Sequence, residues 1–428
     1  MSRPFSLTRA LLALATASIL TGCTGTASAP PAPAPIASLP PIPSPSPHEQ
    51  IARYEAVDLD AFRDPTPAST SSLYGGLRAL IYGDAATAEA RLNEAVSTIP
   101  DSLRPFVYDR LAALKARQFE WREALRYETL RAEAAGESFD PTTSKWSVFA
   151  ARPQPTAEVD GDAATVSFDG YRIDGSVEGP VGARDARFFI DTGAPVTLLS
   201  RALADELGLA LDSTAGGAVS IPAIGINGAA VLRTTLDRVT VGGVTFRNLP
   251  ADVLDTERSI ADGADLFLGF DAFRGLLGGI RFGFADSTFT MYASGSAPDR
   301  DLAPNLLLES GYAFHAYRAG GQPFTGLVDT GSPFSYVYAD WWTPPEDATP
   351  RPVTHRGRLA DTEYEFTLDY YDFRATLAGA PFDALSLGLS TRGQPGDPFR
   401  VMSLLGTGLF EDGALLLDFD RRVLAFER

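Results

Sequence analysis

The chain carries the same short motif twice, and this repetition constrains its fold more than any other feature. An Asp-Thr-Gly triplet follows an apolar run at Asp191 and again at Asp329. An apolar-apolar-Gly sequence follows each triplet at almost the same spacing, ending at Gly269 in the first copy and at Gly406 in the second. A single triplet would occur by chance in roughly one chain in ten of this length. Two copies with matching flanks and spacing indicate that one structural unit is present twice.

The sequence around both motifs predicts short β-strands. From about Ala157 onward, polar and apolar residues alternate, and Gly-Gly, Asp-Gly and Ala-Asp-Ser turns interrupt the alternation. Similar segments follow each motif, and each half ends on a strand rich in Phe. We therefore expect an all-β region of two related lobes, over residues 157–296 and 301–428.

The region before these lobes has a different composition and residue pattern. Residues 49–140 are rich in Ala, Leu, Arg and Glu, with apolar residues such as Leu73 and Leu77 at helical spacing. A segment around Ala90 aligns with one around Ala124. The distance in sequence between these two alanines equals the period of tetratricopeptide repeats, which the region therefore resembles. A plain helical bundle is the alternative. Either arrangement is short and should lean on a neighbouring domain.

The N-terminus has the features of an export signal. Residues 1–22 contain two arginines and an apolar run that is too short to span a bilayer. The run ends in Leu-Thr-Gly-Cys, which resembles the lipobox of bacterial lipoproteins and implies lipid attachment at Cys23. An isolated core cysteine is the alternative, but the Pro-rich stretch at 23–48 predicts an extended linker. We expect an anchored protein of the bacterial cell envelope that faces the periplasm, and Thr24 favours the outer membrane.

Composition excludes several classes of function. The formal net charge of -18 argues against nucleic acid as a partner, because a phosphate backbone selects basic surfaces. Cys23 is the only cysteine, which excludes intrachain disulfides and thiolate metal sites. His48, His315 and His355 are scattered without metal-ligand spacing, so they are expected to be ordinary surface or core residues. We expect no metal and no cofactor.

The repeated motif can support acid–base chemistry. It places a carboxylate at the end of a buried apolar strand, beside a Thr hydroxyl and a Gly that permits a tight turn. Two such loops facing each other would hold Asp191 and Asp329 close enough to share one proton, because two adjacent carboxylates cannot both ionise cheaply. One carboxylate can then take a proton from a water that attacks a peptide carbonyl, while the other donates to the carbonyl oxygen.

These features resemble the aspartic peptidases, and the lobes are more similar to the retropepsin-like type than to the larger pepsin-like lobe. The resemblance rests on FIDTGA with FLGFD and on LVDTGS with LLGTG, and it covers the chain from about Ala157 onward. It implies an all-β bilobal acid-protease-like fold after the helical segment, with Asp191 and Asp329 as the catalytic pair. The residues that would support this pair are Thr192, Gly193, Thr330, Gly331 and Ser332. Among them, the two Thr residues would brace each other.

The two motifs also differ from each other. Ala194 follows the first and Ser332 the second, so only the second copy has a hydroxyl that could donate to its own carboxylate and make the pair asymmetric. Pro195 and Pro333 follow in both copies, which is unusual for the family. These departures keep open the hypothesis of a weak or inactive peptidase-like lipoprotein that binds peptides or acts as a scaffold. The two motifs make a homodimeric site unnecessary, so a monomer is expected.

A flap over the cleft is expected in the first lobe, because Gly and Asn suit the tip of a hairpin that moves. The candidate residues are Ile224, Gly225, Ile226, Asn227 and Gly228. The corresponding place in the second lobe, at residues 359–363, has no Gly-rich sequence, and we expect no flap there. The sequence thus predicts an exported, lipid-anchored aspartic endopeptidase with a polypeptide substrate, whose helical region could meet a protein partner.

Overall fold

The structure is a computed structural model of the chain. It describes residues 45–56, 58–62, 71–213, 218–221, 226–254, 264–309, 311–344, 346, 348–359, 362–390 and 402–428. The expected export signal, Cys23, and two of the expected flap residues, Ile224 and Gly225, lie outside the described residues. Ser44–Arg428 forms one compact unit. No helix within the described ranges is both long and apolar enough to cross a membrane.

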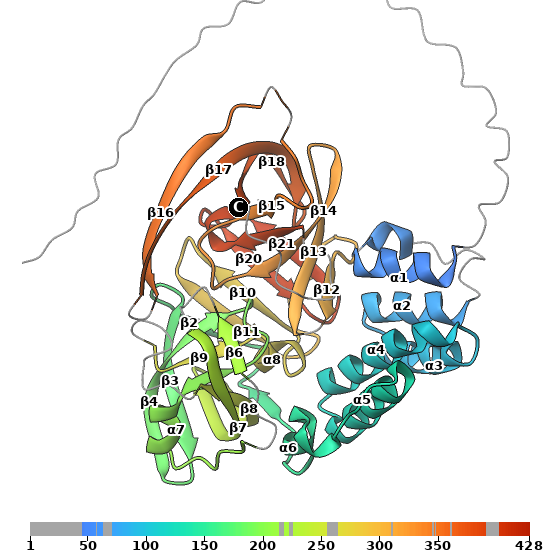
Figure 1. Ribbon diagram of the computed structural model, residues 1–428. Coiled ribbons are helices and arrows are strands. Elements are labelled where there is room, and N and C mark those ends of the chain that lie inside the picture. Colours follow the sequence, from blue (N-terminus) through green and yellow to red (C-terminus); the bar gives the residue numbers. More distant parts are fainter. Residues whose placement is uncertain are drawn as a thin grey trace, which may run out of the picture. The chain divides into compact units, whose positions relative to one another are not determined.

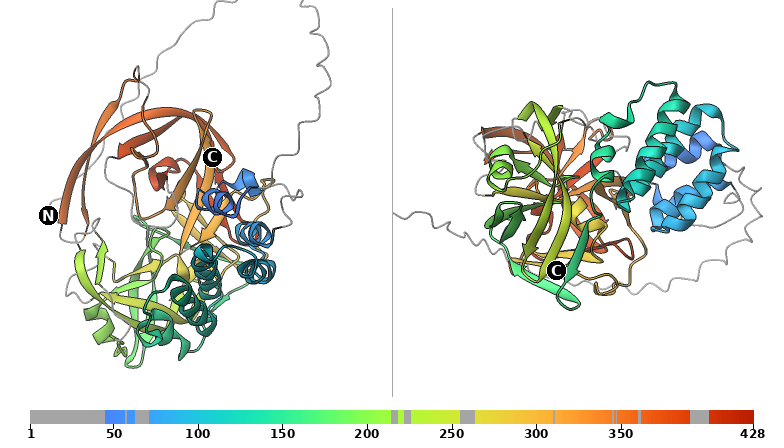
Figure 2. Two further views of the ribbon diagram at one scale, coloured as in Figure 1. Left: turned by 45° about the vertical axis from the view of Figure 1, so that its right-hand side comes forward. Right: turned by 90° about the horizontal axis from the view of Figure 1, so that it is seen from below.

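The described N-terminal part is helical (Figures 1 and 2). Its helices are α1 (Pro47–Glu55), α2 (Ser72–Tyr82), α3 (Ala85–Val96), α4 (Arg104–Arg117), α5 (Trp121–Ala135) and α6 (Lys145–Ala150), with 3-10 turns at Leu59–Phe62, Asp101–Leu103 and Pro141–Thr143. Gly83 ends α2 in the left-handed conformation, with φ 78°, and the Asp84 side chain caps α3 by accepting from the backbone N–H of Thr87. The helical region therefore extends to Ala150, beyond its expected end at residue 140.

The two helical pairs are not related by one constant distance in sequence. α2 packs against α3 and α4 against α5, but the distance in sequence from α2 to α4 is shorter than that from α3 to α5. Ala90 is exposed, and Ala88 occupies the buried position in α3 that Ala124 occupies in α5. The alignment of Ala90 with Ala124 is therefore wrong by two residues. The likeness to tetratricopeptide repeats stays a prediction.

Each lobe contains a closed ring of six strands. The first ring runs β3, β4, β9, β5, β8, β7 and back to β3. The second runs β13, β14, β19, β15, β18, β17 and back to β13. The first set spans β3 (Arg172–Gly179), β4 (Gly182–Asp191), β5 (Leu198–Ser200), β7 (Ile226–Val241), β8 (Val244–Leu254) and β9 (Leu266–Gly269). The second spans β13 (Tyr312–Ala319), β14 (Gln322–Asp329), β15 (Tyr336–Tyr338), β17 (Thr362–Leu377), β18 (Ala380–Ser390) and β19 (Ser403–Gly406). The matching strand order confirms the predicted duplication.

A five-stranded antiparallel sheet joins the two lobes. Its strands are, in spatial order, β2 (Ala163–Ser167), β11 (Thr288–Tyr292), β10 (Gly279–Gly283), β20 (Ala414–Asp418) and β21 (Val423–Glu427). The central pair, β10 and β20, brings one strand from each half together. Phe282 and Phe289 are fully buried on this sheet, within the core that spans both lobes. The Phe-rich strands predicted to close each half therefore form one shared element.

A long hairpin extends each ring. In the first lobe, β6 (Ala218–Ile221) pairs with the start of β7. In the second, β16 (Arg351–Leu359) pairs along its whole length with β17 (Figure 1). The expectation that the second lobe lacks such a hairpin is therefore wrong. Cross-strand pairs such as Thr354 with Thr367 and His355 with Phe366 favour this pairing, and it does not depend on a Gly-rich tip.

The helical region packs on the second lobe through β12 (Leu306–Glu309) and β13. Leu307, Phe314 and Tyr338 belong to the same buried cluster as the apolar residues of the helices. Beside this cluster, the buried Glu309 side chain accepts a hydrogen bond from Tyr54 at 3.2 Å and forms an ion pair with Arg110 at 3.3 Å. The prediction that the short helical region leans on a neighbour is confirmed.

Candidate active site

The two Asp-Thr-Gly motifs occupy equivalent places in the two rings. β4 ends at Asp191 and β14 ends at Asp329. β9 runs parallel to β4 and places Gly269 opposite Asp191, while β19 runs parallel to β14 and places Gly406 opposite Asp329. The apolar-apolar-Gly sequences noticed in the sequence are thus the strands beside the two motifs.

The two motif loops meet face to face. Gly193 lies against the carboxylate of Asp329, and a Cβ atom built on Gly331 would come within 2.6 Å of both carboxylate oxygens of Asp191. Only glycine fits this close approach. The N–H of Gly193 donates to Asp191 Oδ1 at 2.8 Å, and the N–H of Gly331 donates to Asp329 Oδ1 at 2.9 Å. Each glycine therefore holds its own carboxylate and leaves room for the opposite one.

The two Thr residues lock the loops together. The N–H of Thr192 donates to Thr330 Oγ1 at 3.0 Å, and the N–H of Thr330 donates to Thr192 Oγ1 at 3.0 Å. Their hydroxyls donate onward across the interface, to the carbonyl of Val328 at 2.9 Å and to that of Ile190 at 3.4 Å. Both Thr side chains are buried, so these bonds are shielded from water.

We predict that Thr192→Val destabilises the protein by about 2–4 kcal/mol, because the N–H of Thr330 and the carbonyl of Val328 both lose a buried partner. Valine keeps the shape of the side chain. Urea unfolding measures the change. Thr354→Val is the control, because it removes an exposed Thr–Thr bond of 2.9 Å and should change stability by less than about 0.5 kcal/mol. Equal effects of the two substitutions would contradict the proposed lock.

The environment of the carboxylates favours a retained proton. Burial raises the pKa of Asp191, and N–H donors such as that of Gly193 oppose this shift. Burial and the adjacent charge of Asp191 raise the pKa of Asp329 well above its ordinary value. Both residues keep part of their surface open to solvent. Both shifts favour a proton on the pair, and the two carboxylates are not fully buried.

The hydroxyl of Ser332 does not contact the Asp329 carboxylate. It donates to the carbonyl of Phe334 at 3.0 Å and accepts from the N–H of that residue at 3.2 Å. The expectation of an asymmetric pair caused by this hydroxyl is therefore wrong. The backbone N–H groups of Ala194 and Ser332 donate to the main-chain carbonyls of Asp191 and Asp329 at 3.3 Å, and both N–H groups act to lower the pKa of the carboxyl group in their own motif, whatever the side chain.

Two further hydroxyl residues support the site, and the sequence reasoning missed them. Thr197 and Ser335 each stand six residues after a motif Asp and are buried. Thr197 Oγ1 accepts from the N–H of Gly269 at 3.3 Å, and Ser335 Oγ accepts from the N–H of Gly406 at 2.8 Å. A hydroxyl residue at the same offset in both copies was the signal that could have identified them.

A third carboxyl group lies behind the first motif. Oδ1 of Asp271, in α8 (Asp271–Arg274), accepts from Thr197 Oγ1 at 3.2 Å. Burial raises the pKa of Asp271 to about 7, and the charge of Arg274 opposes this shift. The second lobe has Gly408 at the equivalent place, two residues after Gly406. The two halves of the site therefore differ in this supporting group.

We predict that Asp271 contributes stability that is lost as pH rises. The folded state keeps its proton up to about pH 7, whereas the unfolded chain releases it near the ordinary value of 3.8. Folding therefore takes up a proton between these values, so the free energy of unfolding should fall by about 1.4 kcal/mol per pH unit for this group. Urea unfolding at pH 4, 5, 6 and 7 measures how the free energy of unfolding depends on pH. In Asp271→Asn this dependence should be weaker than in wild type, by the equivalent of about one proton. An unchanged slope would contradict the prediction.

The second-lobe hairpin reaches the motif loop of that lobe. Phe334, five residues after Asp329, contacts His355 of β16 with ring centroids 4.3 Å apart and Phe366 of β17 at 5.3 Å. Tyr370 Oη lies 3.0 Å from His355 Nε2. This hairpin thus occupies the place of a flap in the second lobe. In the first lobe, Ile226, Asn227 and Gly228 begin strand β7.

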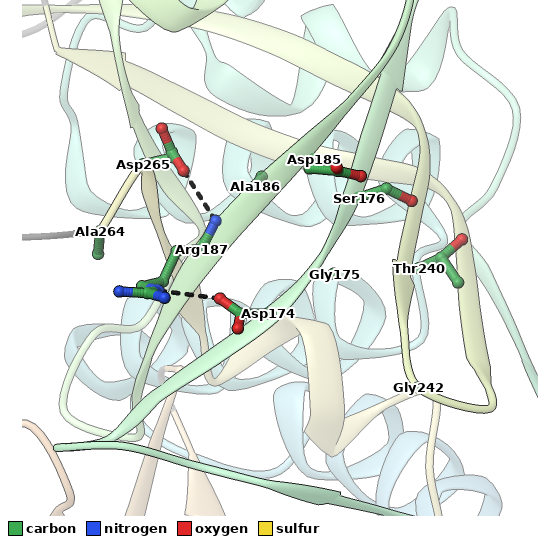
Figure 3. Close-up of a pocket in the computed structure, with 10 residues that line it drawn as sticks. All are labelled: Asp174, Gly175, Ser176, Asp185, Ala186, Arg187, Thr240, Gly242, Ala264 and Asp265. Carbon is green, nitrogen blue, oxygen red and sulfur yellow. Dashed lines mark hydrogen bonds and ion pairs between the residues drawn. The ribbon is translucent and has the colours of Figure 1, made fainter.

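A hollow of about 990 Å³ lies elsewhere on the first lobe (Figure 3). Its lining comprises Asp174, Gly175, Ser176, Asp185, Ala186, Arg187, Thr240, Gly242, Ala264 and Asp265. Arg187 pairs with Asp174 at 2.9 Å, and its N–H donates to Asp265 at 2.7 Å. Arg187 precedes Asp191 by four residues, which is roughly 13 Å along a strand. This hollow is therefore separate from the two carboxylates.

Other residues considered in the sequence have structural roles. His315 is buried and bonds through both ring nitrogens, to the carbonyl of Asn305 at 2.9 Å and to the N–H of Ala378 at 3.0 Å. A nitrogen that accepts an N–H carries no proton, so this ring is neutral, and burial lowers its pKa to about 4. Asp418, at the end of β20, pairs with Arg421 at 2.8 Å.

The first lobe matches a known protein family. A family model described as aspartyl protease matches residues 172–272. The matched segment contains Asp191 and Gly269 but not Asp329. The comparison with curated proteins found no match.

Three solved structures are similar to parts of the chain. A retropepsin-like aspartic protease from Rickettsia conorii shares 22% identity, covering 33% of this chain and 97% of that one, with a TM-score of 0.23. An aspartic proteinase from Irpex lacteus shares 14% identity over 64% of this chain and 97% of that one, with a TM-score of 0.34. Basic 7S globulin from soybean shares 10% identity over 63% and 95%, with a TM-score of 0.38. The structure itself shows an N-terminal helical region followed by a largely β region that contains two closed rings of strands.

Proposed function

We propose that the protein is an aspartic endopeptidase that hydrolyses polypeptides with Asp191 and Asp329. The observation that carries this proposal is the paired loop geometry, in which each motif Gly lies against the opposite carboxylate. The reciprocal Thr192 and Thr330 bonds hold that geometry in place. The family match to the first lobe agrees with it.

The proposed reaction uses the shared proton of the pair. The ionised carboxylate takes a proton from a water molecule held between Asp191 and Asp329, and that water attacks the peptide carbonyl carbon. The protonated carboxyl group donates its proton to the carbonyl oxygen, which gives a neutral tetrahedral intermediate. The carboxyl group that took the proton from water then donates it to the nitrogen, while the other carboxylate takes a proton from a hydroxyl of the intermediate. The C–N bond breaks, which releases the amine and the new carboxyl group and restores the shared proton. The raised pKa of Asp329 favours retention of the required proton.

We further propose that the protein is exported and anchored by a lipid at Cys23, with the catalytic lobes in the periplasm. The apolar N-terminal run, the Leu-Thr-Gly-Cys sequence and the Pro-rich stretch support this proposal. The helical region would then offer a surface for a protein partner. Labelling with a radioactive fatty acid in cells, lost in Cys23→Ala, would test the anchor.

Incubation with an unfolded protein tests the proposed activity. Purified protein should cut the substrate internally between about pH 4 and 7, as mass spectrometry of the products would show. A peptide analogue with a hydroxyl-bearing tetrahedral carbon in place of the scissile carbonyl should inhibit the cutting, because it occupies the position of the intermediate. Tight binding of the analogue or of peptides without any cutting would instead favour a peptide-binding protein.

A further inference from the structure

Arginines from three parts of the fold lie close enough for their charges to interact. Arg117 ends α4, Arg274 ends α8 of the first lobe, and Arg422 lies in the turn between β20 and β21. The Arg422 guanidinium packs on the α2–α3 turn, where a Cβ atom on Gly83 would come within 2.5 Å of its Nε. A Cβ atom on Gly275 would come within 2.9 Å of the Arg117 carbonyl, so α8 and the end of α4 are also in contact.

The acidic groups near these arginines are already engaged. Glu309 interacts with Arg110 at 3.3 Å, with Arg117 at 3.7 Å and with Tyr54. The carboxylate of Asp420 accepts from Gly295 N–H at 2.7 Å and from the hydroxyl of Ser294 at 3.2 Å. Asp271 accepts from Thr197.

Arg274 and Arg422 make no direct ion pair with a described residue, and the nearby carboxylates of Asp271, Glu309 and Asp420 act on them only through space. The structure gives neither side chain an ion pair or a hydrogen bond with any described residue. Nε of Arg274 and both Nε and Nη1 of Arg422 are buried polar atoms without a partner among the described residues. Unpaired buried cations are costly and rare, because burial removes their hydration.

Neighbouring arginines also disfavour the charge of both guanidinium groups. Burial together with the nearby Arg117 and Arg274 lowers the pKa of Arg422 to about 9. Burial and Arg117 lower the pKa of Arg274 to about 10. This excess of positive charge occurs in a chain whose formal net charge is -18. A bound anion would remove the conflict.

We propose that Arg274 and Arg422 form a binding site for a small oxyanion of the phosphate class. Each guanidinium offers a planar set of N–H donors that matches oxygens on a tetrahedral anion, and bidentate pairing gives such contacts their strength. Both side chains keep part of their surface open to solvent, so an anion can reach them. Because Arg274 comes from the first lobe and Arg422 from the second, the anion would connect the two lobes. The site lies outside the dyad and does not depend on the proposed peptidase activity.

Inorganic phosphate is the probe that tests the site. Melting temperature is measured in phosphate and in sodium chloride at equal ionic strength and pH, because a ligand that binds only the folded state stabilises it by mass action. Wild type should melt at a higher temperature in phosphate, with a saturable dependence on concentration. Arg274→Gln and Arg422→Gln should each weaken the apparent affinity at least tenfold. Arg126→Gln, which changes a half-exposed arginine of α5, is the control and should respond like wild type.

Two further measurements complete the test. Calorimetric titration with phosphate gives the affinity directly, and Arg422→Lys keeps the charge if the Gln variant fails to fold but should still bind more weakly. Phosphatidic acid vesicles separate a lipid headgroup from a free anion: co-sedimentation that depends on Arg274 and Arg422 would identify the lipid as the source. Equal melting in phosphate and chloride, or an unchanged response in both Gln variants, would overturn the proposal.

Discussion

Asp191→Asn and Asp329→Asn should each lower the rate of peptide cleavage by about 10²- to 10⁴-fold, because each removes one half of the acid–base pair. An amide neither takes a proton from water nor donates one as a carboxyl group does. Both variants should stay folded, since Asn fits the same space and the Thr192–Thr330 bonds remain. Cutting of an unfolded protein at pH 5 measures the rate, and urea unfolding verifies the fold.

The matched control is Asp185→Asn, because this exposed carboxylate lies on the same strand, β4, at the separate hollow. It should keep the wild-type rate. Full activity in either dyad variant would contradict the assignment of Asp191 and Asp329. Loss of activity in the control as well would point to a general effect of charge.

Glu309→Gln should destabilise the protein by about 3–5 kcal/mol, the usual cost of removing one partner from a buried ion pair. Glu309 and Arg110 are each only 2% exposed, and Arg117 and Tyr54 share the same carboxylate. Without that charge, Arg110 would lose the counter-charge that is buried beside it. Urea unfolding in phosphate-free buffer measures the change, so that a bound anion cannot replace the lost carboxylate.

Glu365→Gln is the control for this second prediction. Glu365 pairs with Arg356 on the exposed β16–β17 hairpin, and surface pairs contribute at most about 1 kcal/mol. A change of less than about 1 kcal/mol in Glu309→Gln would show that the helical region is held by its apolar contacts alone. Selective loss of helical signal at low urea would show that this region unfolds first.

The duplicated lobes and the facing carboxylates could be predicted because short local patterns determine them. Asp191 pairs with Gly269, and Asp329 with Gly406, through strand register, and the sequence contains both strands in full. The direction of the Ser332 hydroxyl could not be predicted, because it depends on how the loop brings the Phe334 carbonyl within reach. The proximity of Arg274 to Arg422 could not be predicted either, because these residues lie far apart in the chain and belong to no motif.

The second-lobe hairpin shows a different limit. Its tip lacks the Gly-rich sequence that marks tight turns, so turn chemistry gave no signal. The signal for the hairpin was the alternation of side-chain types along residues 351–359 and 362–370. Pairing of β17 with β18 stabilises the hairpin. Tertiary contacts, not the turn, define this element.

The shared five-stranded sheet limits how the cleft can open. The rungs between β10 and β20 run from Gly279–Asp418 to Gly283–Ala414 across the boundary between the halves. A hinge motion that swung one lobe away from the other would have to break this ladder, which is flanked on both sides by further paired strands. Access to the two carboxylates should therefore depend on bending of the β6–β7 and β16–β17 hairpins, with the lobes acting as one rigid frame. A chain nicked between residues 296 and 301 should accordingly hold together as a single particle.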